Sequence, residues 1–223
     1  MIELERRDEV FLLQMTAGDN RFNPTSLAAW HAALDEVESS EGPAALVTTG
    51  NGKFYSNGLD LDWMGAQSDP GAAAGLVSDV IRLFGRMLGF PMFTVAAMNG
   101  HAFAAGAMLA LAHDARVMRS DRGYFCLPEV DLGMPLAPGM TALIKARLSA
   151  AAAHEAVVTG RRFGAEACLA AGIVDEAQPE DEVVRHAVAR ALAHTGKDRR
   201  AVQVLKRGLY ADVLPVLEAG ALP

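Results

Sequence analysis

Hydrophobic and polar positions along the chain follow two different periods, which predicts that strands and helices are interleaved. Short apolar runs bounded by charged residues, or by Gly, Pro and Asn, are typical of buried strands. We expect strands over residues 2–5, 10–15, 43–49, 93–98 and 115–118, with a further extended piece over 123–127. The first two are separated by the charged segment 6–9, so they are predicted to pair around a polar turn.

Apolar residues spaced by three and four predict two helices in the first half of the chain. The first stripe consists of Leu27, Trp30, Leu34 and Val37. Asn23 and Pro24 precede this stripe, and a capping side chain followed by proline is a typical helix start, so a helix is predicted to run to about residue 39. The second stripe consists of Val77, Ile81, Phe84 and Leu88, within a predicted helix over 72–89.

From residue 140 onward the pattern is almost wholly helical. The predicted helices cover 140–148, 150–159, 165–171 with Gly172 as its stop, 180–194, and 199 to about 217. Strands with interleaved helices followed by helices alone indicate an α/β core that carries a helical C-terminal appendage. We place the core at residues 1–195, including the helical region from about 140, and the helical tail at 196–223.

The stretch 92–114 joins a buried strand to the start of a helix through an Asn99-Gly100 turn. The first turn of a helix has backbone N–H groups without internal partners and carries the positive end of the helix dipole, so it stabilises a developing negative charge. Small residues would let a ligand approach this backbone: Ala102, Ala104, Ala105 and Gly106. A purely structural strand-turn-helix joint is the more common interpretation of such a stretch in an α/β protein.

A second joint of the same kind lies at residues 53–64. Ser56, Asn57 and Gly58 are typical turn residues, and Asp60 is placed to cap a short helix beginning near Leu61. Each joint has backbone N–H groups without partners, and the N–H groups of both joints can be directed at one oxygen atom. Taken alone, however, a capped turn is more often structural, and Asp60 is better interpreted as a cap than as an acid catalyst.

Composition narrows the classes of partner and compartment. A net charge of -7 and an isoelectric point near 5.3 argue against a nucleic-acid or anionic-membrane surface, since both favour a basic face. The two cysteines, Cys126 and Cys168, form no C-x-x-C motif and are too few for a disulfide scaffold. With no signal peptide recognisable at the N-terminus, we expect a cytoplasmic protein.

Individual polar or missing residues argue against two other classes, membrane-spanning proteins and zinc proteins. Asn99, His101 and His113 interrupt the most apolar stretch, so it is not expected to span a membrane. His154 begins a sequence similar to a zinc-binding H-E-x-x-H motif, but Val158 stands where the second histidine is required. No metal site is therefore expected.

Four motifs together resemble the crotonase (enoyl-CoA hydratase/isomerase) superfamily. They are K-F-Y-S-N-G-L-D-L at 53–61, A-M-N-G-H-A-F-A-A-G at 97–106, P-E-V-D-L-G at 128–133, and G-R-R-F-G-A-E-A-C-L-A-A-G-I-V-D-E at 160–176. They occur in the family's order and at similar spacing, within a resemblance that covers about residues 10–195. The resemblance implies a crotonase-like core of repeated ββα units with a helical C-terminal appendage.

The resemblance also implies an acyl-CoA substrate, with coenzyme A as part of the substrate and no separate cofactor. By motif position, the backbone N–H groups of Leu59 and Ala105 would hold the thioester carbonyl oxygen as it becomes an enolate. Further substrate contacts are implied at Ser56, Asn57, Gly58, Asp60, Leu61, Gly106 and Met108. Phe103, Met108 and Trp63 are candidates for the wall of an acyl pocket, or for the hydrophobic core.

The reaction is predicted from two positions. Hydratases of the family carry two glutamates; here Glu129 occupies the second position and Met108 stands at the first. Moving a double bond needs one base that takes a proton from C2 and returns it to C4, whereas hydration needs an activated water. We therefore predict a 3-enoyl-CoA to 2-enoyl-CoA isomerase of fatty acid degradation. The alternatives are a hydratase or another crotonase-type thioester reaction, and a non-catalytic acyl-CoA-binding subunit.

One basic cluster stands out near the C-terminus of this acidic protein: Lys197, Arg199, Arg200, Lys206 and Arg207. In the family, C-terminal helices support trimer contacts and basic side chains approach the coenzyme A phosphates. The resemblance therefore implies a homotrimer or a dimer of trimers. A solvated helix face explains the cluster equally well.

Overall fold

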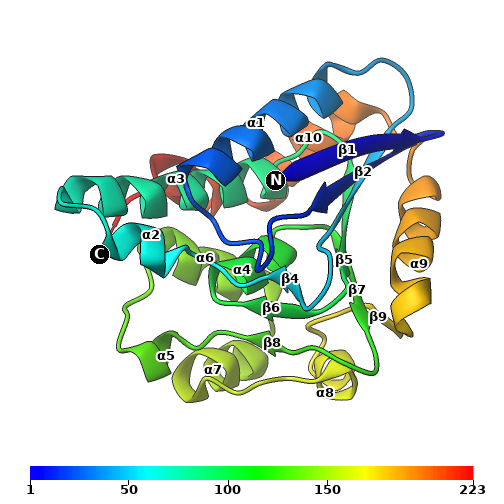
Figure 1. Ribbon diagram of the computed structural model, residues 1–223. Helices are drawn as coiled ribbons and strands as arrows, with labels where there is room; N and C mark the ends of the chain where they lie inside the picture. The colour runs from blue at the N-terminus through cyan, green and yellow to red at the C-terminus, as the bar shows by residue number, and fades with distance from the viewer. Residues whose placement is uncertain (223) are drawn as a thin grey trace.

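The computed structural model describes residues 1–222, without the side chain of Pro70, and arranges them as two sheets with helices around them (Figure 1). The strands are β1 Ile2–Arg7, β2 Val10–Met15, β3 Ala45–Thr49, β4 Phe54–Ser56, β5 Phe93–Met98, β6 His101–Phe103, β7 Ala115–Arg119, β8 Phe125–Cys126 and β9 Glu176–Gln178. The helices are α1 Pro24–Ser39, α2 Leu61–Gly65, α3 Pro70–Leu88, α4 Ala105–Leu111, α5 Glu129–Leu132, α6 Pro138–Arg147, α7 Ala150–Thr159, α8 Ala165–Ala170, α9 Glu180–Leu192, α10 Arg199–Leu209 and α11 Leu214–Ala219.

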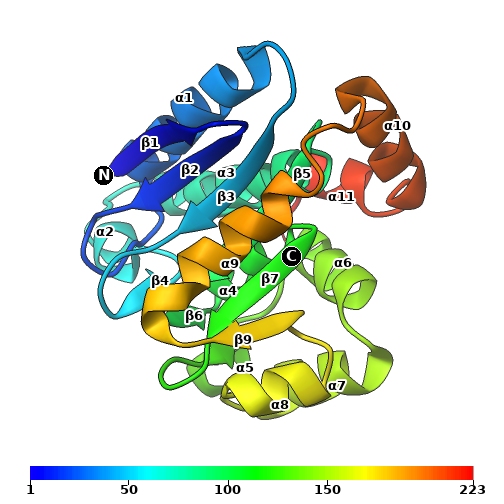
Figure 2. The same cartoon turned by 90° about the vertical axis from the view of Figure 1, so that its right-hand side faces the viewer.

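The larger sheet has the strand order β1-β2-β3-β5-β7-β9, and every pair except β1-β2 is parallel. Its central strands are buried on both faces, as expected for a parallel sheet covered by helices. Ala45 and Val47 of β3 pack with Val183 and Ala187 of α9. Leu46, on the opposite face, belongs to the main core with α1 and α3. Figure 2 shows α9 lying across this sheet.

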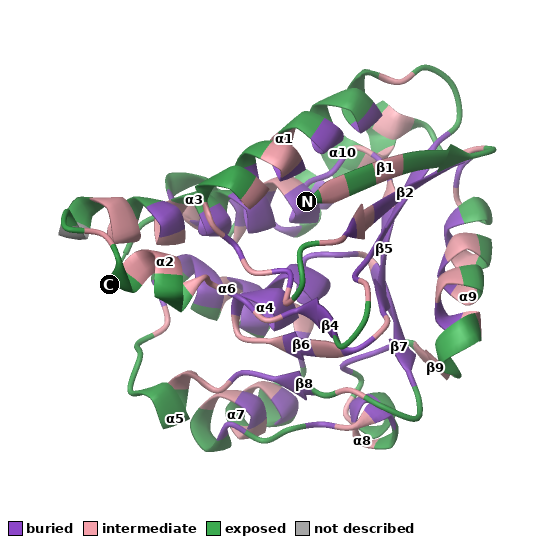
Figure 3. Ribbon diagram, in the orientation of Figure 1, coloured by how far each residue is buried: buried purple, intermediate pink, exposed green. Residues whose placement is uncertain are grey.

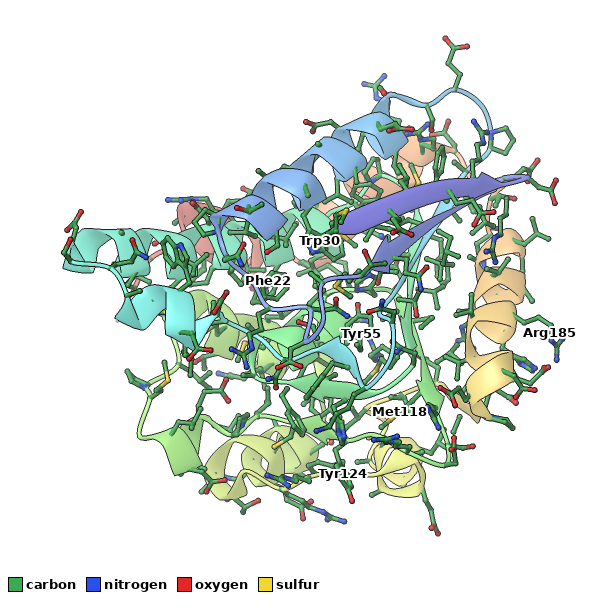
Figure 4. All side chains as sticks on the ribbon, in the orientation of Figure 1. Phe22, Trp30, Tyr55, Met118, Tyr124 and Arg185 are labelled. Carbon is green, nitrogen blue, oxygen red and sulfur yellow. The ribbon has the colours of Figure 1, made fainter. Side chains whose placement is uncertain are left out.

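A smaller parallel sheet, β4-β6-β8, lies beside the larger one. Each of its strands follows a strand of the larger sheet and precedes a helix, in the sequences β3-β4-α2, β5-β6-α4 and β7-β8-α5. The expected repeat of ββα units is therefore confirmed. Figure 4 shows Phe22, Trp30 and Tyr55 directed into the interior, with Tyr124 and Arg185 toward the outside.

Two helix starts confirm the capping signals in the sequence. The Asn23 side chain accepts a hydrogen bond from the backbone N–H of Ser26, whose hydroxyl accepts one from the Asn23 N–H. The carboxylate of Asp60 accepts a hydrogen bond from the N–H of Trp63 at 3.1 Å, so α2 begins at Leu61 as predicted.

Two sequence predictions are wrong in detail. The Asn99-Gly100 turn does not lead directly into a helix, because β6 intervenes and pairs with β4 and β8. The predicted helix from residue 199 to about 217 is two helices, α10 and α11, separated by a turn at Tyr210–Val213. Pro215 has no N–H to donate and occupies the first turn of α11, where proline is tolerated but where a continuing helix would be interrupted.

The C-terminal helix α11 packs against α3 and α6. Leu214 and Leu217 of α11 belong to the same hydrophobic core as Ile81 and Leu83 of α3. The division of the chain into a core at 1–195 and a tail at 196–223 stays a prediction. Within residues 1–222, no helix combines the length and apolar character needed to cross a bilayer.

Candidate active site

Three helix starts lie at one edge of the small sheet. The parallel strands β4, β6 and β8 are neighbours, so their carboxyl ends lie side by side and deliver α2, α4 and α5 to the same region. Leu59 lies just before α2, Ala105 is the first residue of α4, and Glu129 is the first residue of α5. All three residues line one cavity of about 480 Å³.

Two glycines let the Leu59 loop and α4 approach each other closely. A Cβ atom at Gly106 would lie 2.3 Å from the carbonyl oxygen of Ser56, so only glycine fits there without displacing the backbone. Gly58 has a φ of +82°, and its Cβ would lie 3.2 Å from the amide nitrogen of Ala105. Glycine at these two positions brings the two backbones together and keeps the space in front of the Ala105 amide open.

The amides of Leu59 and Ala105 are available to a ligand. Phe22 holds the Leu59 loop in place, because its N–H donates to the Gly58 carbonyl at 2.8 Å and its carbonyl accepts from the Asp60 N–H at 2.9 Å. Within residues 1–222, neither the Leu59 nor the Ala105 N–H donates to a protein acceptor. Two free donors at the wall of an apolar cavity form a site that can stabilise an oxyanion.

The residue just before α4 has an unusual backbone conformation. Ala104 has φ +50° and ψ -123°, which lies outside the left-handed region and is otherwise a conformation of glycine. Its N–H donates to the Cys126 carbonyl at 3.0 Å, and its carbonyl accepts from the Met108 N–H at 3.1 Å. These bonds hold the strained peptide in the orientation that presents the next amide, that of Ala105, to the cavity.

Glu129 places a carboxyl group in the same cavity. Its Oε2 atom is buried and has no hydrogen-bond partner among the described residues. Burial raises the pKa of Glu129 above its ordinary value of 4.5, and a hydrogen bond from its own backbone N–H opposes this shift. A desolvated carboxylate with a raised pKa is a stronger base than one in water.

The remaining wall of the cavity is mostly apolar. Its hydrophobic lining includes Leu61, Val77, Phe103, Ala104, Pro128, Leu132, Met134, Pro135, Ala137, Met140 and Leu222. The other charged residues of the wall, Arg21 and Asp62, form an ion pair at 2.6 Å. The cavity therefore combines one unpaired carboxyl group, two free amides and an apolar enclosure.

The sequence-predicted site residues fall into two groups. Those that line the cavity are Asn57, Leu59, Leu61, Ala105 and Glu129. Those outside its lining are Ser56, Gly58, Asp60, Gly106 and Met108. The two glycines of the second group shape the site through their backbone. The side chains of Ser56 and Asp60 form hydrogen bonds elsewhere, and that of Met108 lies in the core.

Ser56 and Asp60 have structural partners. The Ser56 hydroxyl is buried and donates to the Asn20 carbonyl at 2.7 Å, and Ser56 ends β4 where a turn was expected. Asp60 caps α2 and also accepts from the Asn23 side chain at 3.0 Å. These partners explain why neither side chain is directed into the cavity.

Met108 requires a correction. Its side chain is fully buried in the main core and lies outside the cavity lining, so of its two candidate places, the acyl-pocket wall and the core, it occupies the core. Phe103 does line the cavity, whereas Trp63 packs at the edge of the core. Figure 3 shows α4 buried and α5 exposed, which matches these positions.

A buried polar chain behind the site was not predicted from the sequence. The Tyr55 hydroxyl lies 2.8 Å from the Thr48 hydroxyl, which lies 2.8 Å from Nε2 of His113. The other ring nitrogen of His113 lies 2.8 Å from the Leu109 carbonyl, so it carries the proton. Burial lowers the pKa of His113 to about 3, so the ring is neutral and this chain ties β3 and β4 to α4.

The basic C-terminal cluster is largely occupied within the protein. Lys206 is buried, pairs with Asp114 at 2.6 Å and donates to the Met92 carbonyl at 2.9 Å. Arg199 donates to backbone carbonyls at the end of α1, including that of Glu38 at 2.7 Å. Lys206 is therefore a structural cation, which corrects its assignment to a solvated or phosphate-binding face.

Among the described residues, no group of three or more His, Cys, Asp or Glu side chains is arranged to hold a metal ion. Cys126 and Cys168 are both buried free thiols, and burial raises the pKa of Cys126 to about 11. Neither thiol lines the cavity. Among the described residues of the cavity wall, the unpaired reactive groups are therefore the Glu129 carboxyl and the two amides.

The fold and the site define a protein of the crotonase type. The family model for enoyl-CoA hydratase/isomerase matches residues 5–221, and the chain belongs to this family. It is 39% identical over 189 residues to enoyl-CoA delta isomerase 2, peroxisomal, of Arabidopsis thaliana. The matched region covers 82% of this chain and 79% of that protein. It is 36% identical over 232 residues to enoyl-CoA delta isomerase 3 of the same plant, covering 99% and 97%.

Solved structures agree with the fold. The crystal structure of a probable enoyl-CoA hydratase, EchA3, from Mycobacterium tuberculosis H37Rv matches with a TM-score of 0.91 at 30% identity, covering 98% of this chain and 92% of that chain. An enoyl-CoA hydratase/isomerase family protein from Pseudomonas syringae matches with a TM-score of 0.91 at 29% identity, covering 98% and 94%.

Proposed function

We propose that this protein is an enoyl-CoA delta isomerase that shifts the double bond of a 3-enoyl-CoA to the 2-position. The observation that carries the proposal is the single unpaired carboxyl group, Glu129, among the described residues of the cavity wall. Asp62 also lines the cavity, but it pairs with Arg21 and its side chain is 88% exposed. One base beside two free amides suits a proton transfer through an enolate.

The reaction uses the described groups in two steps. The thioester oxygen accepts hydrogen bonds from the Leu59 and Ala105 amides while the Glu129 carboxylate takes a proton from C2, and the C–H electron pair forms the enolate. The enolate then reforms the carbonyl, the C3–C4 double-bond electrons take the proton from Glu129 at C4, and a C2–C3 double bond remains. Glu129 is returned as a carboxylate.

The environment of Glu129 supports this role. Burial raises its pKa, which strengthens it as a base, and the apolar wall limits the access of water that would compete for the enolate. The position of Glu129 at the N-terminus of α5 keeps the carboxyl group close to its own backbone N–H, which moderates the shift of its pKa.

The alternatives differ in their chemical requirements. Hydration needs a water molecule activated by a pair of carboxylates, and Met108 supplies no carboxylate at the position where hydratases of the family have one. A non-catalytic acyl-CoA-binding subunit has no use for a buried carboxyl group that disfavours its charged form. Both remain outcomes of the following test.

The test supplies the purified protein with 3-hexenoyl-CoA and follows the conjugated 2-enoyl product by its absorbance. We expect turnover in the wild type, a loss of about 10²-fold or more in Glu129→Gln, and near-wild-type activity in Asp131→Asn. Asp131 is a matched control because it is a carboxylate of the same short helix that does not line the cavity. Full turnover in Glu129→Gln contradicts the proposal, and a 3-hydroxyacyl product favours hydration.

We further propose a homotrimer or a dimer of trimers. Support comes from α10, where Val204, Leu205 and Leu209 expose large apolar side chains on a helix that belongs to the C-terminal region. Light scattering gives the mass in solution. Replacement of Leu205 and Leu209 by Lys is expected to yield monomers, and an unchanged mass would place the contacts elsewhere.

We propose that catalysis needs no cofactor beyond the coenzyme A of the substrate, because Glu129 both accepts and returns the proton. Activity is therefore expected to survive dialysis against a chelator, and its loss would contradict the proposal. We also propose a cytoplasmic location, supported by the two free cysteines. Fractionation of cells that produce the protein tests the location.

A further inference from the structure

The mouth of the active-site cavity is surrounded by exposed hydrophobic side chains. They are Leu61 at the start of α2, Leu132 at the end of α5, Met134 in the following loop, and Leu222 after α11. Each of the four is exposed and also lines the cavity. Single exposed hydrophobic residues are ordinary, but a group continuous with a catalytic cavity marks a surface that is covered when the ligand binds.

The four residues, which we call the apolar rim, continue the inner wall of the cavity. Val77 of α3 and Met140 of α6 form part of the apolar wall further along, together with Ala137. Besides Asn57 and Glu129, the polar lining consists of the pair Arg21–Asp62, whose charges satisfy each other. Leu61, Leu132 and Leu222 come from segments far apart in the sequence, yet all three line the same cavity.

We propose that a long, unbranched acyl chain fills this cavity and extends across the apolar rim, so that the protein prefers long-chain over short-chain 3-enoyl-CoA substrates. This inference rests on the proposed isomerase function and specifies its substrate class. Each methylene group that the protein shields from water is worth up to about fourfold in binding. A six-carbon chain ends close to the reacting carbons, whereas a twelve-carbon chain has six further methylene positions with which to cover the rim.

Leu132 gives the sharpest test because its neighbour Val130 is a matched control. Both residues lie on α5, and they are 52% and 49% exposed, so neither substitution removes a core side chain. Leu132 lines the cavity and Val130 does not. Asparagine is a suitable replacement for both, because it is polar and uncharged and so adds no charge near Glu129.

The experiment measures kcat/KM for 3-hexenoyl-CoA and 3-dodecenoyl-CoA in the wild type, Leu132→Asn and Val130→Asn. We expect the wild type to prefer the longer substrate by at least about tenfold. Leu132→Asn should lose about tenfold on the longer substrate and less than about twofold on the shorter one, while Val130→Asn should change neither. Equal wild-type values for the two substrates, or equal losses on both in Leu132→Asn, would overturn the inference.

Calorimetry with saturated hexanoyl-CoA and dodecanoyl-CoA separates this inference from the isomerase proposal. If no substrate turns over, tighter binding of dodecanoyl-CoA that Leu132→Asn weakens still supports the apolar rim, and equal affinity refutes it. Light scattering measures the oligomeric state of both variants and tests a different role for the rim. If Leu132→Asn changes the oligomeric state and Val130→Asn does not, the rim is a contact between copies of the chain, and the acyl-chain assignment is wrong.

Discussion

Gly106 lies so close to Ser56 that a Cβ atom on the glycine would be 2.3 Å from the serine carbonyl oxygen. This contact joins the first turn of α4 to the end of β4. The Leu59 loop continues directly from β4, so the same contact sets the spacing of the Leu59 and Ala105 amides. Gly106 has no side chain with which to contact a ligand, yet the positions of the two amides depend on it.

Replacing Gly106 by Ala is expected to lower kcat/KM by about 10²-fold, because displacement of either backbone misdirects one of the two amide donors. The control is Gly75→Ala in α3, where a Cβ atom meets nothing within 4 Å. That variant should keep full activity and gain roughly 0.5–1 kcal/mol of stability, because alanine is the better helix residue. Wild-type kinetics in a folded Gly106→Ala protein would show that the close approach does not position the amides.

Ala104→Gly should separate stability from activity. Relief of the strained backbone is worth about 1–3 kcal/mol, while the added freedom of glycine in the unfolded chain costs about 0.5–1 kcal/mol. We therefore expect the melting temperature to rise by about 2–4 °C, measured by calorimetry. We also expect kcat to fall with little change in KM, because the Ala105 amide is held less firmly. A lower melting temperature would contradict the strain at Ala104.

The raised pKa of Glu129 has opposite consequences for activity and stability. Activity should be lost as the pH falls through the pKa of the folded protein, which lies above 4.5, since the base must be ionised. The free energy of unfolding has the opposite pH dependence: the Glu129 carboxyl group lowers it as the pH rises. Below the pKa of the unfolded chain both states hold the proton, and as the pH rises through the folded pKa the native state must bear a buried carboxylate.

Glu129→Gln should therefore be more stable than the wild type at pH 7, and the difference should shrink toward pH 4, as measured by chemical denaturation at both values. Asp131→Asn serves as the control, because Asp131 is exposed on the same helix. Equal stability of Glu129→Gln and the wild type at pH 7 would mean that the carboxyl group is solvated.

Lys206 and Arg207 are adjacent but should respond very differently to replacement by Met. Lys206 is buried against Asp114, and removing one partner of such a pair costs about 3–5 kcal/mol. Arg207 pairs with Glu218 at the surface, where a pair is worth at most about 1 kcal/mol. Urea unfolding of the two variants measures the difference. Similar small losses would show that Lys206 is not a structural cation.

Much of the site could be predicted because it depends on local signals. The Asn23 and Asp60 caps, the Phe93–Met98 strand and two of the three strand-to-helix joints follow from residues close to one another in the sequence. These signals place Leu59 and Ala105 at helix starts, whereas Glu129 was identified by the family motif alone and α5 was not predicted. Their convergence on one oxygen, however, depends on β4, β6 and β8 being neighbours.

What the sequence did not predict depends on contacts between distant segments. Lys206 is buried because α10 places it against Asp114 and the Met92 carbonyl, both about a hundred residues earlier, and a lysine gives no sign of burial in advance. Met108 lies in the core because every residue of α4 is buried. β6 has only three residues and was missed because an Ala/Gly-rich segment has no strand pattern. The ion pair Arg21–Asp62 in the cavity wall joins residues 41 positions apart, so spacing alone gave no indication of it.

The central claim is that Glu129 takes the proton from C2 and returns it to C4. The most direct measurement is a single turnover of 3-hexenoyl-CoA deuterated at C2, with the product analysed by mass spectrometry and NMR. The account predicts that a measurable fraction of the deuterium appears at C4 in the wild type, and that Glu129→Gln forms product at least about 10²-fold more slowly. A product without deuterium at C4, or undiminished turnover by Glu129→Gln, would contradict it.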